Sequence, residues 1–195
     1  RGDVAAGDNG LSAIAGREAE ARSAIDEAIT YAVAIGAANI HVMAGFAAGD
    51  QAHATFVDNL TYACKNAAPH GITILIEPLN KYDAPGYFLR TTDQAIGIIS
   101  EVGVKNLKLM FDCYHVQLME GDLTHRIEKL LPYIGHIQFA SVPDRGAPDH
   151  GEINYSHVFQ VIVGLGYAAP TGAEYKPKGP TDQSLEWMKD LRATK

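Results

Sequence analysis

The chain of 195 residues has the length of one large domain, and 47% hydrophobic residues are enough to fill a core. A net charge of −7 argues against a nucleic-acid partner, because proteins that bind nucleic acids usually carry a basic face. No apolar run approaches the roughly 18 residues of a membrane span, so we expect no membrane partner. Cys64 and Cys113 form no C-x-x-C pair, which disfavours a zinc ribbon and fits a reducing, cytoplasmic location. The chain starts at Arg1 rather than Met, so we expect that this is not its native start.

Helices and strands are predicted to alternate after a Gly- and Asp-rich opening loop of about sixteen residues. Thr91 with Gln94 resembles a capping box, and Asp122 and Ser156 are expected to cap two later helices. Helices are expected at about 17–35, 51–67, 91–102, 122–131, 156–165 and 181–191. Strands are expected at about 38–45, 72–79, 107–115, 136–141 and 171–177.

The predicted strands are nearly continuous apolar runs, which is typical of parallel sheets covered on both faces. We therefore expect an α/β fold, and because no linker is visible we expect a single domain over residues 1–195. A TIM-type (β/α)₈ barrel fits the alternation, but it needs eight strands and about 250 residues. This chain is expected to supply about five βα units, with N-terminal strands absent.

Four polar residues each lie in an apolar, strand-like run: Glu77, Asp112, Gln138 and Glu174. Their spacings are 35, 26 and 36 residues, close to the roughly 30 residues of one βα unit. Carboxylates are rarely buried unless they are paired or bind a metal, so matching positions on successive strands predict one shared site. Three carboxylates and an amide oxygen favour Mg²⁺ or Mn²⁺ over zinc.

A divalent ion at this site would polarise adjacent carbonyl and hydroxyl oxygens of a substrate. Glu77 and Glu174 come from strands that are far apart in the order, so they could face opposite sides of the substrate. One would remove a proton next to the carbonyl, and the other would return it at the neighbouring carbon. That is the chemistry of an enediol isomerase or epimerase.

The segments IEPLN, FDCYHVQLMEGDL, GHIQFASVPDRGAPDHGEINY and EYKP resemble the hydroxypyruvate isomerase family, a branch of the xylose-isomerase-like TIM barrels. The resemblance extends from AGREAEAR to SLEWM, which is nearly the whole chain. It implies that Glu77 and Glu174 are the acid/base pair and also metal ligands, with Asp112 and Gln138 completing the metal shell. Because family members have eight strands, the resemblance also implies that this chain supplies strands four to eight.

Four further residues are candidates for substrate binding: His115, Arg145, His41 and Lys176. His115 could hydrogen-bond a substrate oxygen, although a supporting His is an alternative. Arg145 follows the Gln138 strand and could hold a carboxylate through two parallel hydrogen bonds, although loop arginines are usually solvated. His41 could point into the barrel mouth or be a core His, and Lys176 lies just past a strand end, where a peripheral role is an alternative.

The resemblance implies an aldose–ketose isomerase that interconverts hydroxypyruvate and tartronate semialdehyde. A 2-oxo-tetronate isomerase and a sugar 3-epimerase remain alternatives, since the sequence does not reveal the volume of the pocket. An endonuclease-IV-like phosphodiesterase would share the barrel, but the net charge and the Gln and Glu ligands argue against it. A non-catalytic fragment, dimerised through an open sheet edge, is a further alternative that would make the chain a homo-oligomer.

Overall fold

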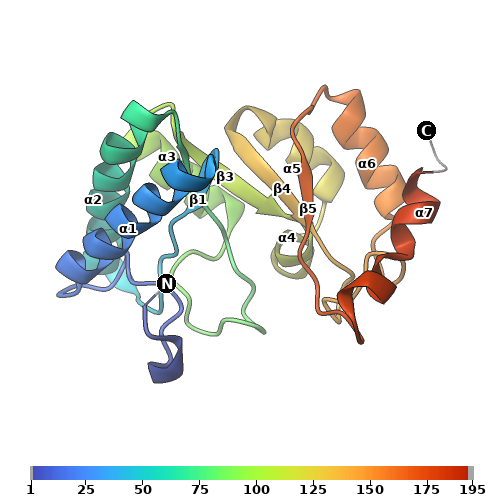
Figure 1. Ribbon diagram of the computed structural model, residues 1–195, viewed down its shortest axis with the longest axis horizontal. Helices are drawn as coiled ribbons and strands as arrows, with labels where there is room; N and C mark the ends of the chain where they lie inside the picture. Colours follow the sequence, from blue (N-terminus) through green and yellow to red (C-terminus); the bar gives the residue numbers. More distant parts are fainter. Residues whose placement is uncertain (1, 193–195) are drawn as a thin grey trace. The chain divides into compact units, whose positions relative to one another are not determined.

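The computed structural model describes residues 2–192, which form two compact units. The first unit extends to Met110, and the second begins at Phe111, inside a strand that the two units share (Figure 1). The single domain expected from the sequence stays a prediction. No helix within residues 2–192 is long and apolar enough to cross a membrane.

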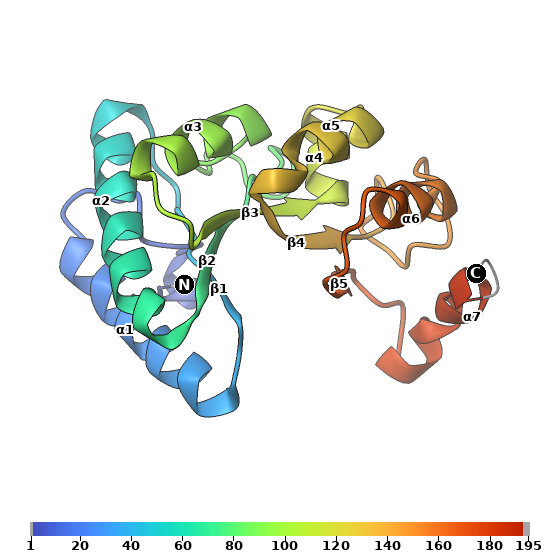
Figure 2. The same ribbon diagram turned by 90° about the horizontal axis from the view of Figure 1, so that it is seen from above.

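The first unit is built on parallel strands with helices packed against them (Figures 1 and 2). Strand β2 lies between β1 and β3, with Ile40 opposite Ile74 and Ile76 opposite Leu109. Helix α1 packs against α2 and β1, and α2 packs against β2 and α3. The elements are η1 (Val4–Ala6), α1 (Glu18–Ile35), β1 (Asn39–His41), α2 (Gly49–Ala67), η2 (Ala68–His70), β2 (Thr73–Ile76), α3 (Thr92–Val102) and β3 (Leu107–Asp112).

Helix α2 shows why the first unit folds as it does. Phe56, Leu60 and Ala63 recur at helical spacing, and all three are fully buried. Ile74 of β2 and Leu109 of β3 are also fully buried, as strands covered by helices require. Each large apolar side chain removed from water in this way contributes roughly 1.5–3 kcal/mol.

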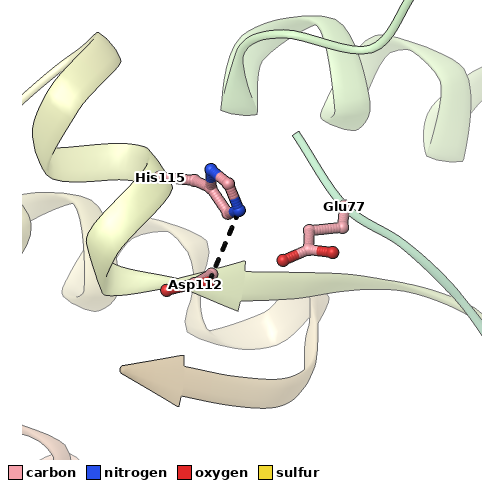
Figure 3. A group of neighbouring side chains, drawn as sticks. All are labelled: Glu77, Asp112 and His115. Carbon is pink, nitrogen blue, oxygen red and sulfur yellow. Dashed lines mark ion pairs between the residues drawn. The ribbon is translucent and has the colours of Figure 1, made fainter. Parts of the chain in front are cut away.

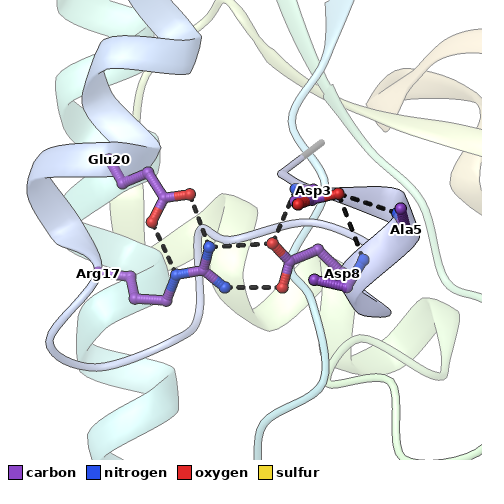
Figure 4. Close-up of polar contacts among 6 residues, drawn as sticks. Asp3, Ala5, Asp8, Arg17 and Glu20 are labelled. Carbon is purple, nitrogen blue, oxygen red and sulfur yellow. Dashed lines mark hydrogen bonds and ion pairs between the residues drawn. The ribbon is translucent and has the colours of Figure 1, made fainter.

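The opening segment is held to α1 by a network of charges centred on Arg17 (Figure 4). The Arg17 guanidinium donates to Asp8 at 2.7 and 2.9 Å and to Glu20 at 2.8 and 2.6 Å. These bonds raise the pKa of Arg17 and hold the pKa of Asp8 below its usual value. The opening loop is therefore anchored to the start of α1 by these charged hydrogen bonds.

The second unit pairs β4 with β5 in parallel, with Ile137 opposite Thr171 and Phe139 opposite Ala173. Phe139 is the centre of an aromatic cluster and meets Phe159 and Trp187 edge to face, with ring centroids 4.9 and 5.8 Å away. The elements are α4 (Cys113–Met119), α5 (Leu123–Leu130), η3 (Leu131–Tyr133), β4 (Ile134–Phe139), α6 (Tyr155–Gly164), β5 (Thr171–Ala173), η4 (Thr181–Leu185) and α7 (Trp187–Arg192).

One of the three predicted helix caps is confirmed. Thr91 Oγ accepts a hydrogen bond from the Gln94 backbone N–H at 3.2 Å, as a cap requires. Asp122 precedes α5 but makes no cap bond, and its carboxylate contacts His125 Nδ1 at 2.6 Å instead. The Ser156 cap is wrong, because Asn154 accepts the capping bond from the His157 backbone N–H and α6 begins at Tyr155.

The strand expected over 107–115 ends early, and this is the largest departure from the predicted elements. Asp112 Oδ1 accepts a hydrogen bond from the Tyr114 backbone N–H at 2.8 Å and so starts α4. His115 consequently lies on a helix rather than on a strand. The strand predicted over 38–45 is also shorter, since β1 ends at His41, and the last helix opens with a 3₁₀ turn before Trp187.

Candidate active site

The four predicted ligands all lie at the carboxyl ends of strands. Glu77 follows the last residue of β2, and Asp112 is the last residue of β3. Gln138 is the penultimate residue of β4, and Glu174 follows the last residue of β5. Loops at this end of parallel strands carry the active sites of TIM barrels, so the placement predicted from the spacing is confirmed.

In the first unit, Glu77 lies beside His41. The Glu77 side chain is buried, and its Oε2 lies 3.6 Å from His41 Nδ1. Burial lowers the pKa of His41 to about 4, so its imidazole is neutral at neutral pH and does not form a charged pair with Glu77. The sequence named both residues as site candidates, and the structure brings them together.

In the second unit, Asp112 is the most buried of the predicted ligands, with 1% of its surface exposed. Its Oδ2 lies 3.8 Å from Nε2 of His115 on the first turn of α4 (Figure 3, which also draws Glu77 on the segment after β2). Burial raises the pKa of Asp112 to about 7, and the nearby charge of Arg145 opposes that shift. Asp112 is thus a carboxylate that the surrounding protein does not fully stabilise.

Two buried oxygens of the second unit fit a metal. Asp112 Oδ2 and Gln138 Oε1 accept no hydrogen bond from the described residues, and an unmet buried acceptor costs about 1–3 kcal/mol. Both are acceptor oxygens at strand ends, and hard cations such as Mg²⁺ and Mn²⁺ bind such oxygens. The residues therefore fit the divalent ion expected from the sequence.

Glu174 is held by Arg145 rather than buried as expected. Arg145 Nη2 donates to Glu174 Oε2 at 2.6 Å, and 53% of the Glu174 side chain is exposed. The Arg145 guanidinium also lies over the Tyr114 ring, 5.2 Å from its centroid. The predicted burial of Glu174 is wrong: β5 ends at Ala173, and Glu174 lies on the loop after it with its side chain half exposed.

Lys176 contacts Arg145 through its backbone N–H. Its N–H donates to the Arg145 carbonyl oxygen at 2.7 Å, which ties the segment after β5 to the loop after β4. The predicted role of the Lys176 side chain in substrate binding stays a prediction.

Tyr114 is a site residue that the sequence reasoning missed. It is buried, its ring centroid lies 5.1 Å from that of His115, Arg145 lies over the ring, and it packs with Ala140 and Val142. An aromatic residue two positions after a predicted metal ligand was the available signal, because residues i and i+2 of a strand share a face.

A family model described as xylose isomerase-like TIM barrel matches residues 5–191. The chain belongs to that family. The 2-oxo-tetronate isomerase of Cupriavidus necator is 47% identical to it over 96% of this chain and 74% of the relative. The hydroxypyruvate isomerase of Escherichia coli is 44% identical over 98% of this chain and 76% of the relative. The isomerase class predicted from the sequence is confirmed by these relatives.

A solved structure described as an AP endonuclease, family 2, from Brucella melitensis is 44% identical, with a TM-score of 0.93. The match covers 97% of this chain and 74% of that chain. The predicted TIM-barrel class of fold is confirmed at the level of the xylose isomerase-like family. The finer assignment to strands four to eight receives no support from a match that takes in nearly the whole chain.

Proposed function

We propose that this member of the xylose isomerase-like family interconverts a small 3-hydroxy-2-oxo acid and its 2-hydroxy aldehyde isomer, with hydroxypyruvate and tartronate semialdehyde as the pair. The observation that carries the proposal is the pairing of unmet acceptor oxygens on Asp112 and Gln138 with a cation, Arg145, held in the same unit. The first feature suits a divalent metal, and the second suits a carboxylate.

The metal shell that we propose consists of Glu77, Asp112, Gln138 and Glu174, with Mg²⁺ or Mn²⁺ as the ion. When bound, the ion would polarise the substrate's carbonyl and hydroxyl oxygens. Two observations support this shell. All four residues lie at carboxyl ends of parallel strands, and each offers an oxygen atom as the metal ligand.

Glu77 and Glu174 are proposed as the acid/base pair. A carboxylate that removes the proton next to a carbonyl needs a fixed position, and burial beside neutral His41 gives Glu77 that position. The bond from Arg145 orients Glu174 through one oxygen, Oε2, so Oε1 keeps its capacity to accept a proton. Each residue would act on one of the two adjacent carbons.

Arg145 is proposed to bind the substrate's carboxylate, with His115, His41 and Lys176 as further contacts. Its guanidinium is a planar fork of N–H donors whose shape matches a carboxylate, and its Nη2 already bonds the Glu174 carboxylate at 2.6 Å. The substrate's carboxylate is proposed to bind this fork beside Glu174. A neutral ketose offers no such group, which would favour an oxo-acid over a sugar.

The direct test is an NMR assay with metal-loaded protein and three substrates, hydroxypyruvate, 2-oxo-tetronate and D-fructose. We expect the aldehyde signal of tartronate semialdehyde to grow with hydroxypyruvate, and no change with D-fructose. Faster turnover of 2-oxo-tetronate would shift the assignment to the longer acid, which is the activity named for the Cupriavidus relative. Turnover of the neutral sugar alone would overturn the proposal.

The endonuclease alternative needs its own control, because the Brucella structure carries that description. A duplex with an abasic site should remain uncut and weakly bound, since a net charge of −7 opposes phosphate binding.

We also propose a cytoplasmic location for the enzyme. Both cysteines are free and buried, which supports a reducing compartment.

A further inference from the structure

Arg145 lies in a strained backbone conformation within the loop that joins β4 to α6. Its φ angle is +52°, in the left-handed region that residues other than glycine rarely adopt. Such strain persists when the surroundings enforce it. Two backbone bonds do so here: Arg145 N–H donates to Ser141 O at 2.9 Å, and Ser141 N–H donates to Gly146 O at 3.0 Å.

The Asp144 carboxylate fastens this turn with both of its oxygens. Oδ1 accepts from Ser141 Oγ at 2.8 Å and from the Gly146 backbone N–H at 3.2 Å. Oδ2 lies 2.9 Å from His150 Nε2. Asp144 and Gly146, which flank Arg145, are therefore bonded to each other, and Asp144 is also bonded to Ser141, which is fully buried.

His150 lies between two carboxylates. Its Nδ1 is 2.6 Å from Asp149 Oδ1, and its Nε2 is 2.9 Å from Asp144 Oδ2. Ionised carboxylates only accept hydrogen bonds, so both contacts require a ring that carries both protons. In agreement, Asp149 and Asp144 raise the pKa of His150, and His150 with Ser141 holds the pKa of Asp144 well below its usual range.

The other charged groups near His150 are of both signs. Lys178 Nζ lies 3.7 Å from Asp144 Oδ2. Lys176 and Glu186 line one hollow of about 440 Å³ beside His150, and Glu152 lines another of about 420 Å³. The two carboxylates in direct contact with the ring outweigh these more distant groups.

The ring of His150 also packs closely against the turn. A Cβ at Gly146 would lie 3.0 Å from His150 Cε1 and 2.8 Å from Asp144 Oδ2. A side chain at Gly146, the residue that follows Arg145, would therefore have to displace the Asp144 carboxylate and crowd the His150 ring.

We propose that Asp144 and His150 are a positioning pair for Arg145: the charged contact between them fixes the turn that aims the guanidinium at Glu174 and at the substrate's carboxylate. The inference rests on the proposed function, because it makes specificity for an oxo-acid depend on an ion pair outside the metal site. Loss of the His150 charge weakens the hold on the turn, so affinity for the carboxylate falls at alkaline pH.

His150→Gln tests the pair by kinetics, with hydroxypyruvate as substrate and Mg²⁺ at saturation. We expect KM to rise about fivefold or more near pH 7 while kcat stays within about twofold, since the chemistry itself is untouched. The wild-type KM should rise as the pH passes the raised pKa of His150, and the variant should lack this rise. Asp144→Asn, which keeps the Oδ1 acceptor, should raise KM in the same way.

His125→Gln is the matched control, because His125 also contacts a carboxylate, Asp122, at 2.6 Å and also has a raised pKa. It lies on α5, outside the loop, and should leave KM and its pH profile unchanged. A wild-type KM profile in His150→Gln, or an equal change in the control, overturns the positioning pair.

A second readout needs no turnover. The side-chain N–H signal of Arg145 in an ¹H–¹⁵N NMR spectrum, assigned by its loss in Arg145→Lys, reports the bond to Glu174. We expect faster exchange of this proton with water in His150→Gln than in the wild type. If the wild type fails to convert hydroxypyruvate but the signal responds, the proposed function falls and the pair stands. If the signal is unchanged, the pair falls whatever the substrate.

Discussion

The Asp112→Asn substitution tests whether Asp112 serves to bind a metal or to stabilise the fold. The asparagine side chain can still accept the 2.8 Å bond from the Tyr114 backbone N–H, so the start of α4 survives. The substitution removes a buried charge whose Oδ2 accepts no hydrogen bond from the described residues. In metal-free protein we therefore expect the variant to be more stable than the wild type.

The magnitude follows from the pKa of Asp112, which is raised from 3.8 to about 7. Between pH 3.8 and about pH 7, Asp112 is protonated in the folded state but ionised in the unfolded state. The wild type therefore loses stability as the pH rises through this window. The loss is complete above about pH 7 and amounts to roughly 4 kcal/mol at pH 8, falling to about 2 kcal/mol at pH 5. The Asp112→Asn variant escapes this loss, because its amide does not ionise.

The assay is urea unfolding of both proteins at pH 8 and pH 5, in EDTA and in Mg²⁺. Asp58→Asn, an exposed carboxylate on α2, is the control and should change stability by less than about 0.5 kcal/mol. Mg²⁺ at about 100 times its Kd should add roughly 2.7 kcal/mol to the wild type and nothing to Asp112→Asn. A variant that is less stable than the wild type in EDTA, or that keeps the Mg²⁺ effect, would refute this account of Asp112.

Three further predictions follow from the same structure. Arg145→Met should raise KM for hydroxypyruvate about tenfold or more, whereas Arg90→Met, a loop arginine of the first unit, should leave it unchanged in steady-state kinetics. In urea unfolding, Gly151→Ala should destabilise the protein by about 2 kcal/mol or more, because φ is +86° and the added Cβ would lie 2.3 Å from Val142 O. The control Gly97→Ala, in α3, should stabilise the protein by up to about 1 kcal/mol, because nothing lies within 4 Å of the added Cβ. Calorimetry should show Mg²⁺ affinity falling as the pH drops below about 7, where Asp112 takes up a proton, and an affinity that stays constant from pH 8 to pH 6 would count against Asp112 as a ligand.

The positions of the ligands were predictable because each polar residue interrupts an apolar run that has the length of a strand. Glu77 and Glu174 lie one residue past their strands, and Asp112 lies at the end of its own. Apolar burial and the period of βα units decide these placements, and both are visible along the chain.

The beginning of α4 was not predictable from periodicity, because no turn residue separates β3 from it. The run LKLMFDCYH is largely apolar, so only the hydrogen bond accepted by Asp112 marks the change from strand to helix. The same holds for Ser156, which is one of two neighbouring candidate caps, and the bond accepted by Asn154 decides between them.

Contacts between distant segments were out of reach for a different reason. Arg145 and Glu174 are 29 residues apart, and their bond depends on the left-handed turn at Arg145 and on where β5 ends. Neither feature leaves a periodic pattern. The sequence could therefore name both residues for the site but could not pair them.

The most direct test of the central claim is exchange of the substrate's carbon-bound proton with solvent, measured by ¹H NMR of hydroxypyruvate in D₂O with Mg²⁺. The wild type should incorporate deuterium at the hydroxymethyl carbon as it forms the aldehyde. Glu77→Gln, which keeps an oxygen ligand but loses the base, should slow both processes by roughly 10²-fold or more while substrate affinity changes little. Exchange that continues in Glu77→Gln at the wild-type rate would contradict the assignment of Glu77 as the base.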